Sequence, residues 1–152
     1  MAHATSAIRI AVDAMGGDYA PQEVVRGCLT VASEMPFVDI TLVGDRERIT
    51  AELRGASLPS NVHLRHASQV IDMGESPVQG IRRKRDASIV VCAQMVQDGE
   101  ADAFFSAGNS GAAMAVAALQ IGRIPGIDRP AIAAAIPSKK GRFVLIDAGA
   151  NV

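Results

Sequence analysis

The sequence predicts an α/β fold: an open, mostly parallel sheet with helices on both faces. Short apolar runs alternate along the chain with longer segments whose apolar residues recur at helical spacing. The prolines at positions 36, 59, 125 and 137 all fall between these segments. Strands that alternate with helices in this way are typical of a parallel sheet covered on two sides.

The first two elements show the pattern most clearly. A strand is expected over 8–12, and a helix over 21–34, where Pro21 suits the first helical position and the apolar residues keep a helical period. Residues 1–7 are expected to form a flexible tail and 8–152 to belong to one α/β domain. The later elements are expected as strand 39–43, helix 45–54, strand 62–66, a loop with one or two short helical pieces to residue 85, helix 87–98, strand 102–106, helix 111–121 and strands 131–136 and 143–147.

Composition excludes several classes of function. The chain has 152 residues, a formal net charge of −1, no Trp and one Tyr, so it offers neither a basic surface nor a stacking platform for nucleic acid. Cys28 and Cys92 lie far apart in predicted helices, without a CxxC motif or a signal peptide. They are therefore predicted to be reduced core thiols of a cytosolic protein.

Residues 103–122 carry no charge and have the length of a membrane span. Gly108, Asn109, Ser110 and Gly111 interrupt this run, which divides it into a short strand and a helix of globular length. We therefore expect a buried strand and helix here rather than a span.

This same interruption is the strongest functional signal in the chain. Glycines allow backbone N–H groups to approach a ligand, Asn109 or Ser110 can cap the following helix, and a helix N-terminus favours anions. The alternative is a tight turn without a ligand.

Two further strand ends repeat the scheme. The segment 13–18 (DAMGGD) follows the first strand, and the segment 147–151 (DAGAN) follows the last. Ligands of open α/β sheets bind at the carboxyl ends of strands, so the three segments are expected to converge on one crevice.

These segments carry a resemblance to a known family. In order, they closely resemble the signature segments of the bacterial phosphate acyltransferase family (PlsX). The matching stretches are 13–18 with 20–21, 65–68, 77–88, 106–112, 129–131 and 147–151. The resemblance implies a Rossmann-like sheet of the isocitrate and isopropylmalate dehydrogenase type. Members of that family are longer, so the chain is expected to be an amino-terminal portion that is incomplete at its C-terminus and inactive alone.

The resemblance also implies a reaction. Inorganic phosphate attacks the thioester of a long-chain acyl-acyl carrier protein, and the acyl phosphate product enters phospholipid synthesis. No cofactor and no metal are required. The implied protein is a cytoplasmic homodimer, peripherally associated with the inner face of the cell membrane, with a membrane-bound glycerol-3-phosphate acyltransferase as a further partner.

Three residues are predicted to be catalytic: Asn109, Lys84 and Asp13. Asn109 either donates to the developing oxyanion or caps its helix. Lys84 or Arg82 neutralises phosphate, although the run of four cations at 82–85 also fits a solvated surface. Asp13 either orients donors, accepts a proton or only forms a turn. The predicted phosphate and substrate ligands are Gly16, Gly17, Asp18, Arg82, Ser88, Ser106, Gly108, Ser110, Gly111, Asp147 and Asn151; no metal ligand is predicted.

Three alternatives stay open. His63 and His66 lie an odd number of residues apart, so they face opposite sides of their strand. His66, at the strand end, is the better candidate for the site; the alternative is a purely structural histidine. The chain also fits a phosphate acetyltransferase or an isopropylmalate-dehydrogenase-like enzyme, although the metal-binding carboxylates of the latter are not found. A non-catalytic phosphate-binding module is the third alternative.

Overall fold

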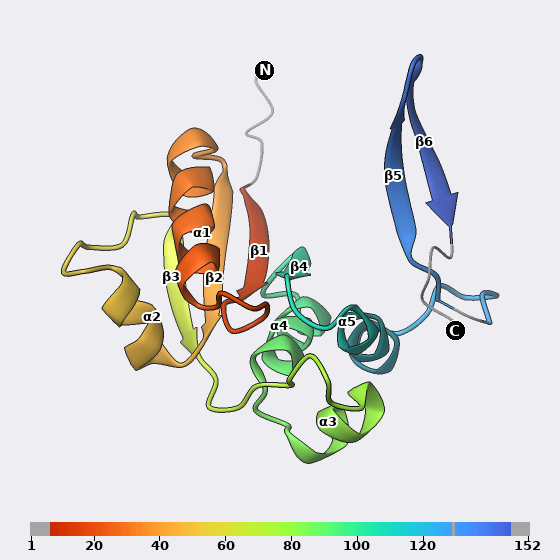
Figure 1. Cartoon of the computed structure of the whole chain (residues 1–152), viewed down its shortest axis with the longest axis horizontal. Coiled ribbons are helices and arrows are strands. Elements are labelled where there is room, and N and C mark those ends of the chain that lie inside the picture. The colour runs from red at the N-terminus through yellow and green to blue at the C-terminus, as the bar shows by residue number, and fades with distance from the viewer. Residues whose placement is uncertain (1–6, 129, 147–152) are drawn as a thin grey trace.

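A four-stranded parallel sheet organises the fold. The computed structural model describes residues 7–128 and 130–146. The strands β1 (Ile8–Asp13), β2 (Val38–Gly44), β3 (Val62–His66) and β4 (Ala103–Ser106) lie in the order β3-β2-β1-β4, and every neighbouring pair is parallel (Figure 1). The predicted α/β class and its parallel sheet are confirmed.

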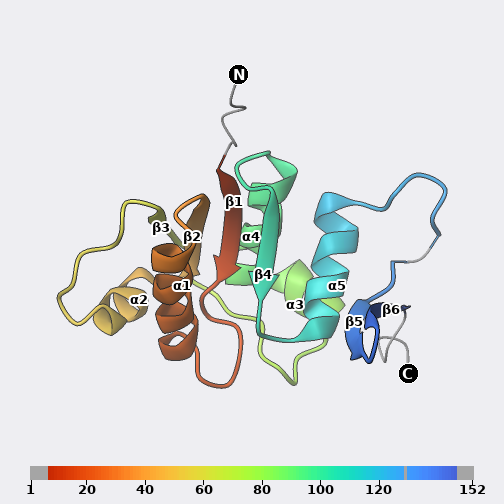
Figure 2. The ribbon, with the colours of Figure 1, turned by 90° about the horizontal axis from the view of Figure 1, so that it is seen from above.

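Helices cover both faces of this sheet. Figure 2 shows α1 (Gln22–Glu34) and α2 (Arg46–Glu52) on one side and α4 (Ser88–Gln97) on the other. Beyond β4 lie α3 (Pro77–Arg83) and α5 (Ser110–Val116), and α5 continues into the π-helical turn η1 (Ala117–Ile121).

Successive side chains of each strand point to opposite faces of the sheet, so they join the core on one side or the other. Val12 and Leu42 pack with α1 and α2, whereas their neighbours Ala11 and Val43 pack with Cys92 of α4. Both faces of β1 and β2 are thus buried, as the near-continuous apolar runs of a parallel sheet require.

The two last strands differ from the prediction. β5 (Ala133–Ser138) and β6 (Gly141–Ile146) form a separate antiparallel hairpin and do not extend the parallel sheet. Lys139 and Lys140 alone separate the paired residues Ser138 and Gly141. A parallel pairing needs a crossover of about a dozen residues or more, whereas a two-residue connection closes a hairpin.

Helix boundaries shift by one or two residues for local reasons. Asp45 precedes α2 as its N-cap and accepts a hydrogen bond from the Arg48 N–H at 3.0 Å. Pro21 precedes α1 as its cap position rather than opening the helix, and the predicted helix 111–121 divides into α5 and η1. No helix in the described part of the chain combines the length and apolar character that a membrane crossing needs. The predicted tail lies almost wholly outside the described residues.

Candidate active site

The site is placed by a reversal in the strand order. The chain passes from β1 outward to β2 and β3, and then returns to the other side of β1 to form β4. In open α/β sheets, ligands bind at the carboxyl ends of the two strands on either side of such a reversal. The segments that leave β1 and β4 are residues 13–18, here called the Gly16 loop, and residues 106–111, here called the Gly108 loop.

These two loops lie against each other. A Cβ atom built on Gly16 would lie 2.6 Å from Asp13 Oδ2, 2.7 Å from Ser106 Oγ and 2.9 Å from the Gly108 nitrogen. A Cβ on Gly108 would lie 3.1 Å from the Gly16 Cα, and Gly17 has a φ of +106°, which favours glycine. Two predicted ligand loops therefore meet, and they do so because glycine stands where the backbones approach.

The Asp13 carboxylate, which is buried, ties the two loops together. Ser88 donates to its Oδ1 at 2.6 Å, Ser106 donates to its Oδ2 at 2.7 Å, and the Met15 N–H donates to Oδ1 at 3.2 Å. The Gly108 N–H in turn donates to the Ser106 Oγ at 3.1 Å. Hydrogen bonds to a carboxylate are stronger than neutral ones, so this network fixes β1, β4 and the start of α4 relative to one another.

Ser88 was predicted as a phosphate ligand, and the structure gives its hydroxyl a different partner. Its side chain is 1% exposed and its proton is directed to Asp13. Asp13 itself forms no ion pair among residues 7–128 and 130–146. We therefore describe both groups as positioning residues of the loops.

Asn109 joins α5 to the segment that precedes α3. Its Oδ1 accepts the Ala112 N–H at 3.0 Å, which is the N-cap bond of α5. Its Nδ2 donates to the carbonyl oxygens of Met73 at 3.0 Å and Glu75 at 3.4 Å. Of the two predicted caps it is Asn109, and not Ser110, that fills the position, and both ends of its amide are engaged.

Lys84 is held by acidic residues of the same segment. Its Nζ donates to Glu75 Oε2 at 2.6 Å and to the Val70 carbonyl at 2.7 Å, and lies 3.7 Å from Asp72 Oδ2. The hydrogen bond to Glu75 raises the pKa of Lys84, and the same bond lowers the pKa of Glu75. Sequence reasoning missed Glu75, because the pair forms only where the segment 70–76 folds back on α3.

Backbone donors remain at the meeting point of the loops. Within the described residues, the N–H groups of Gly17, Ser110 and Gly111 donate no hydrogen bond to the protein. Such N–H groups at the start of a helix, next to a glycine loop, can hold phosphate or an oxyanion.

The side chains of the other predicted residues take no part in the hydrogen bonds between the two loops, or fall outside the described chain. The side chains of Asp18 and Arg82 are exposed, and His66 Nδ1 accepts the Arg46 N–H at 3.4 Å. Asp147 and Asn151 fall outside the described residues, so the third predicted segment is not placed. Among the residues that the structure describes, no three His, Cys, Asp or Glu side chains gather as a metal site.

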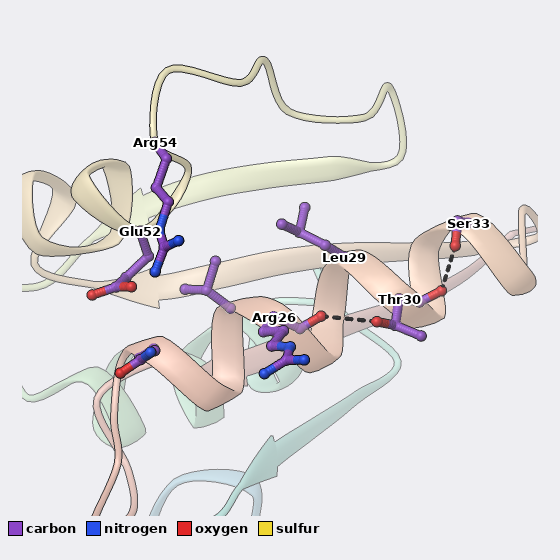
Figure 3. A pocket seen from close by; sticks show the side chains of 8 residues that line it. Arg26, Leu29, Thr30, Ser33, Glu52 and Arg54 are labelled. Carbon is purple, nitrogen blue, oxygen red and sulfur yellow. Dashed lines mark hydrogen bonds between the residues drawn. The ribbon is translucent and has the colours of Figure 1, made fainter.

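One hollow of the described surface lies away from the loops. It measures about 600 Å³ and lies between α1 and the end of α2, where Arg26, Glu52 and Arg54 line it (Figure 3). The hydroxyls of Thr30 and Ser33 donate to carbonyl oxygens of α1 itself, at 3.1 and 2.8 Å. No predicted site residue lines this hollow.

Both cysteines are buried and free, as predicted. Burial raises the pKa of Cys28 to about 11. Burial, and secondly the Asp13 carboxylate, raise the pKa of Cys92 well above its ordinary value. Neither thiol is therefore a nucleophile at neutral pH.

Comparison with known proteins decides the family. A family model described as "Fatty acid synthesis protein" matches residues 8–152. The chain belongs to this family of phosphate acyltransferases. It is 54% identical over 145 residues to the phosphate acyltransferase of Pelotomaculum thermopropionicum, and this match covers 95% of the chain and 42% of the relative. It is 52% identical over 151 residues to the phosphate acyltransferase of Gloeothece citriformis, covering 98% of the chain and 43% of the relative.

The phosphate acyltransferase of Myxococcus xanthus is 48% identical over 147 residues, covering 95% of the chain and 42% of the relative. The chain thus spans less than half the length of these phosphate acyltransferases. The resemblance stated from the motifs is confirmed, and both loops of the site lie inside the matched segment.

Proposed function

We propose that the protein transfers a long-chain acyl group from acyl-acyl carrier protein to inorganic phosphate, giving acyl phosphate for phospholipid synthesis. The observation that carries the proposal is the contact between the Gly16 loop and the Gly108 loop under the Asp13 carboxylate. Family membership supports the class of reaction, because the relatives are named phosphate acyltransferases.

The proposed reaction needs no covalent bond between the protein and either reactant. A phosphate oxygen attacks the thioester carbon, the C–O bond forms as the C–S bond breaks, and the carrier-protein thiolate leaves and takes up a proton from water. The protein must hold two reactants in line and stabilise charge on the thioester oxygen. The N–H groups of Gly17, Ser110 and Gly111, which donate no hydrogen bond to any described residue, suit both tasks.

The predicted catalytic side chains then act mainly by position. Asp13 holds the loops, and Asn109 caps α5 and fixes the segment 73–75. Lys84 holds the same segment through Glu75, which neutralises its charge. Arg82, two residues before Lys84 and exposed in the last turn of α3, is proposed as the cation that reaches an incoming phosphate.

The wider setting is proposed on the family resemblance. We propose a cytoplasmic homodimer at the inner face of the cell membrane, with acyl-acyl carrier protein as substrate and a membrane-bound glycerol-3-phosphate acyltransferase as the consumer of acyl phosphate. Residues 8–152 are then the amino-terminal part of one domain, whose complete sheet is of the isocitrate and isopropylmalate dehydrogenase type.

The test uses a chimera in which this chain is joined to the part of the P. thermopropionicum relative that lies outside the matched segment. It is incubated with palmitoyl-acyl carrier protein, with and without phosphate, and free carrier-protein thiol and acyl phosphate are followed by mass spectrometry. We expect acyl phosphate only when phosphate is present. The double variant Asn109→Ala with Lys84→Ala should abolish it, whereas the control Lys139→Ala, in the exposed turn of the hairpin, should not.

Three outcomes contradict parts of the proposal. Wild-type rates in the double variant refute the site assignment. Protection of the chimera by phosphate without turnover favours a binding module, since a ligand that binds only the folded state stabilises it. Reduction of NAD by the chimera favours the dehydrogenase-like alternative.

A further inference from the structure

The first turn of α4, which carries Ser88, has no side-chain cap of its own. Ala87 occupies the N-cap position, and alanine has no side-chain acceptor for the N–H groups that a helix start leaves without an intrahelical partner. The Ser88 hydroxyl nevertheless lies 2.6 Å from Asp13 Oδ1, in the network that joins the two loops. This turn is held from elsewhere in the chain.

Residues 68–69, which follow β3, hold this turn. Gln69 forms a parallel β-bridge with Ala87. The Gln69 N–H donates to the Asp86 carbonyl oxygen at 3.1 Å, and the Gln69 carbonyl oxygen accepts the Ser88 N–H at 3.0 Å. The Ser88 N–H is one of the donors without an intrahelical partner, so a backbone carbonyl takes the place of the missing cap.

The Asp86 carboxylate holds this bridge together. Its Oδ2 accepts both the Ser68 N–H at 2.7 Å and the Ser68 hydroxyl at 2.6 Å. In return, the Asp86 N–H donates to Gln69 Oε1 at 3.2 Å. The hydrogen bonds from Ser68 lower the pKa of Asp86, so its carboxylate is ionised at neutral pH. Backbone and side chains thus both join the segment after β3 to the start of α4.

The segment after β3 is also fixed beside the Gly16 loop. The Ala67 N–H donates to the Gly44 carbonyl oxygen at 2.9 Å, which extends the pairing of β3 with β2. A Cβ built on Gly44 would lie 2.6 Å from the Met15 Cγ, so the end of β2 packs against the Gly16 loop. The residues that hold α4 are therefore placed relative to the same loop that Ser88 reaches through Asp13.

We propose that Asp86, together with Ser68, is a positioning residue of the site, which sets the first turn of α4 so that the Ser88 hydroxyl reaches Asp13. Asp86 and Ser68 are exposed, whereas Ser88 is buried. Hydrogen bonds between exposed groups exchange with water, so this pair adds little to the net stability of the fold and acts through the geometry of the Gly16 loop. The catalytic consequence of this inference rests on the proposed function, whereas its structural consequence rests on the hydrogen bonds alone.

Three substitutions in the chimera test the catalytic consequence. Asp86→Ala removes the acceptor of both Ser68 bonds, and Asp86→Asn keeps one carbonyl oxygen for them. Asp98→Ala is the matched control, because Asp98 is an exposed hydrogen-bonded carboxylate at the other end of α4. We expect Asp86→Ala to raise the KM for phosphate about tenfold or more and to change the KM for acyl-acyl carrier protein by about twofold at most, since the Gly16 loop supplies phosphate donors.

The conservative variant separates position from charge. Asp86→Asn should restore most of the loss in the KM for phosphate, and Asp98→Ala should change neither KM. A wild-type KM for phosphate in Asp86→Ala overturns the proposal, and so does an Asp86→Asn variant as impaired as Asp86→Ala. If Asp86→Ala does not fold, Ser68→Ala, which removes the hydroxyl and keeps the N–H, is measured in its place with the same outcomes.

Amide hydrogen exchange tests the structural consequence independently of the reaction. The Met15 N–H donates to the Asp13 carboxylate, and its exchange in the chimera should be about tenfold faster or more with Asp86→Ala. Exchange of the Ile40 N–H, buried in β2, should stay unchanged. A wild-type chimera without phosphate-dependent acyl transfer refutes the proposed function and leaves this measurement to decide the positioning role. Unchanged exchange of the Met15 N–H overturns that role.

Discussion

Removing the Ser88 hydroxyl tests whether the buried Asp13 carboxylate holds the site together. Ser88 is 1% exposed and donates to Asp13 Oδ1 at 2.6 Å, so Ser88→Ala leaves this oxygen with one donor among residues 7–128 and 130–146, the Met15 N–H. A hydrogen bond to a buried charged group contributes about 1.5–3 kcal/mol. For a chain of this size, that loss lowers the Tm by roughly 3–12 °C.

The assay is thermal and urea unfolding of Ser88→Ala beside the control Ser33→Ala, whose hydroxyl is exposed and bonds only to its own helix. The double variant Ser88→Ala with Ser106→Ala should show a coupling on the order of 0.5 kcal/mol or more, since both hydroxyls share one carboxylate. The reasoning is refuted if Ser88→Ala costs no more than the control, or if the two losses add without coupling.

Three further predictions concern the loops, the ion pair and the thiols. Gly16→Ala should lower the free energy of unfolding in urea by about 1–3 kcal/mol, because its Cβ would lie under 3 Å from three atoms. Gly74→Ala, where a Cβ meets open space, should lower it little. Equal losses for the two variants contradict the close contact. The hydrogen bond to Lys84 lowers the pKa of Glu75, so the ion pair stabilises the fold above pH 4.5, the ordinary pKa, and this stabilisation is lost as the pH falls through the lowered pKa. Glu75→Gln should therefore flatten that part of the acid unfolding curve followed by circular dichroism. An unchanged curve argues against the pair. Cys28 and Cys92 should react with a thiol reagent at pH 8 only after unfolding in guanidinium, and rapid labelling of the folded chain contradicts their burial.

Local signals in the sequence were enough for the fold class and for the two loops that meet. Alternating strands and helices predicted the parallel sheet, and the glycines at 16, 17, 108 and 111 marked both loops of the site. These signals lie within single segments, so they can be recognised in the sequence alone.

Partners distant in the sequence were not predictable in the same way. The hydroxyl of Ser88 meets Asp13 across 75 positions, and nothing in either local sequence distinguishes a phosphate ligand from a buried hydrogen-bond donor. The pairing of Lys84 with Glu75 depends on how the segment 70–76 folds back on α3. The last strands were predicted by their apolar runs, but the two-residue turn between them, and not their composition, sets the antiparallel pairing.

The central claim is that backbone donors of the two loops bind phosphate, and amide NMR tests it most directly. The chimera is labelled with ¹⁵N-glycine and ¹⁵N-serine and titrated with inorganic phosphate. We predict saturable shifts of the Gly17, Ser110 and Gly111 amides and none of Gly99, which lies at the far end of α4. Absence of any shift at the loop amides, with phosphate-dependent acyl transfer intact, would contradict the account.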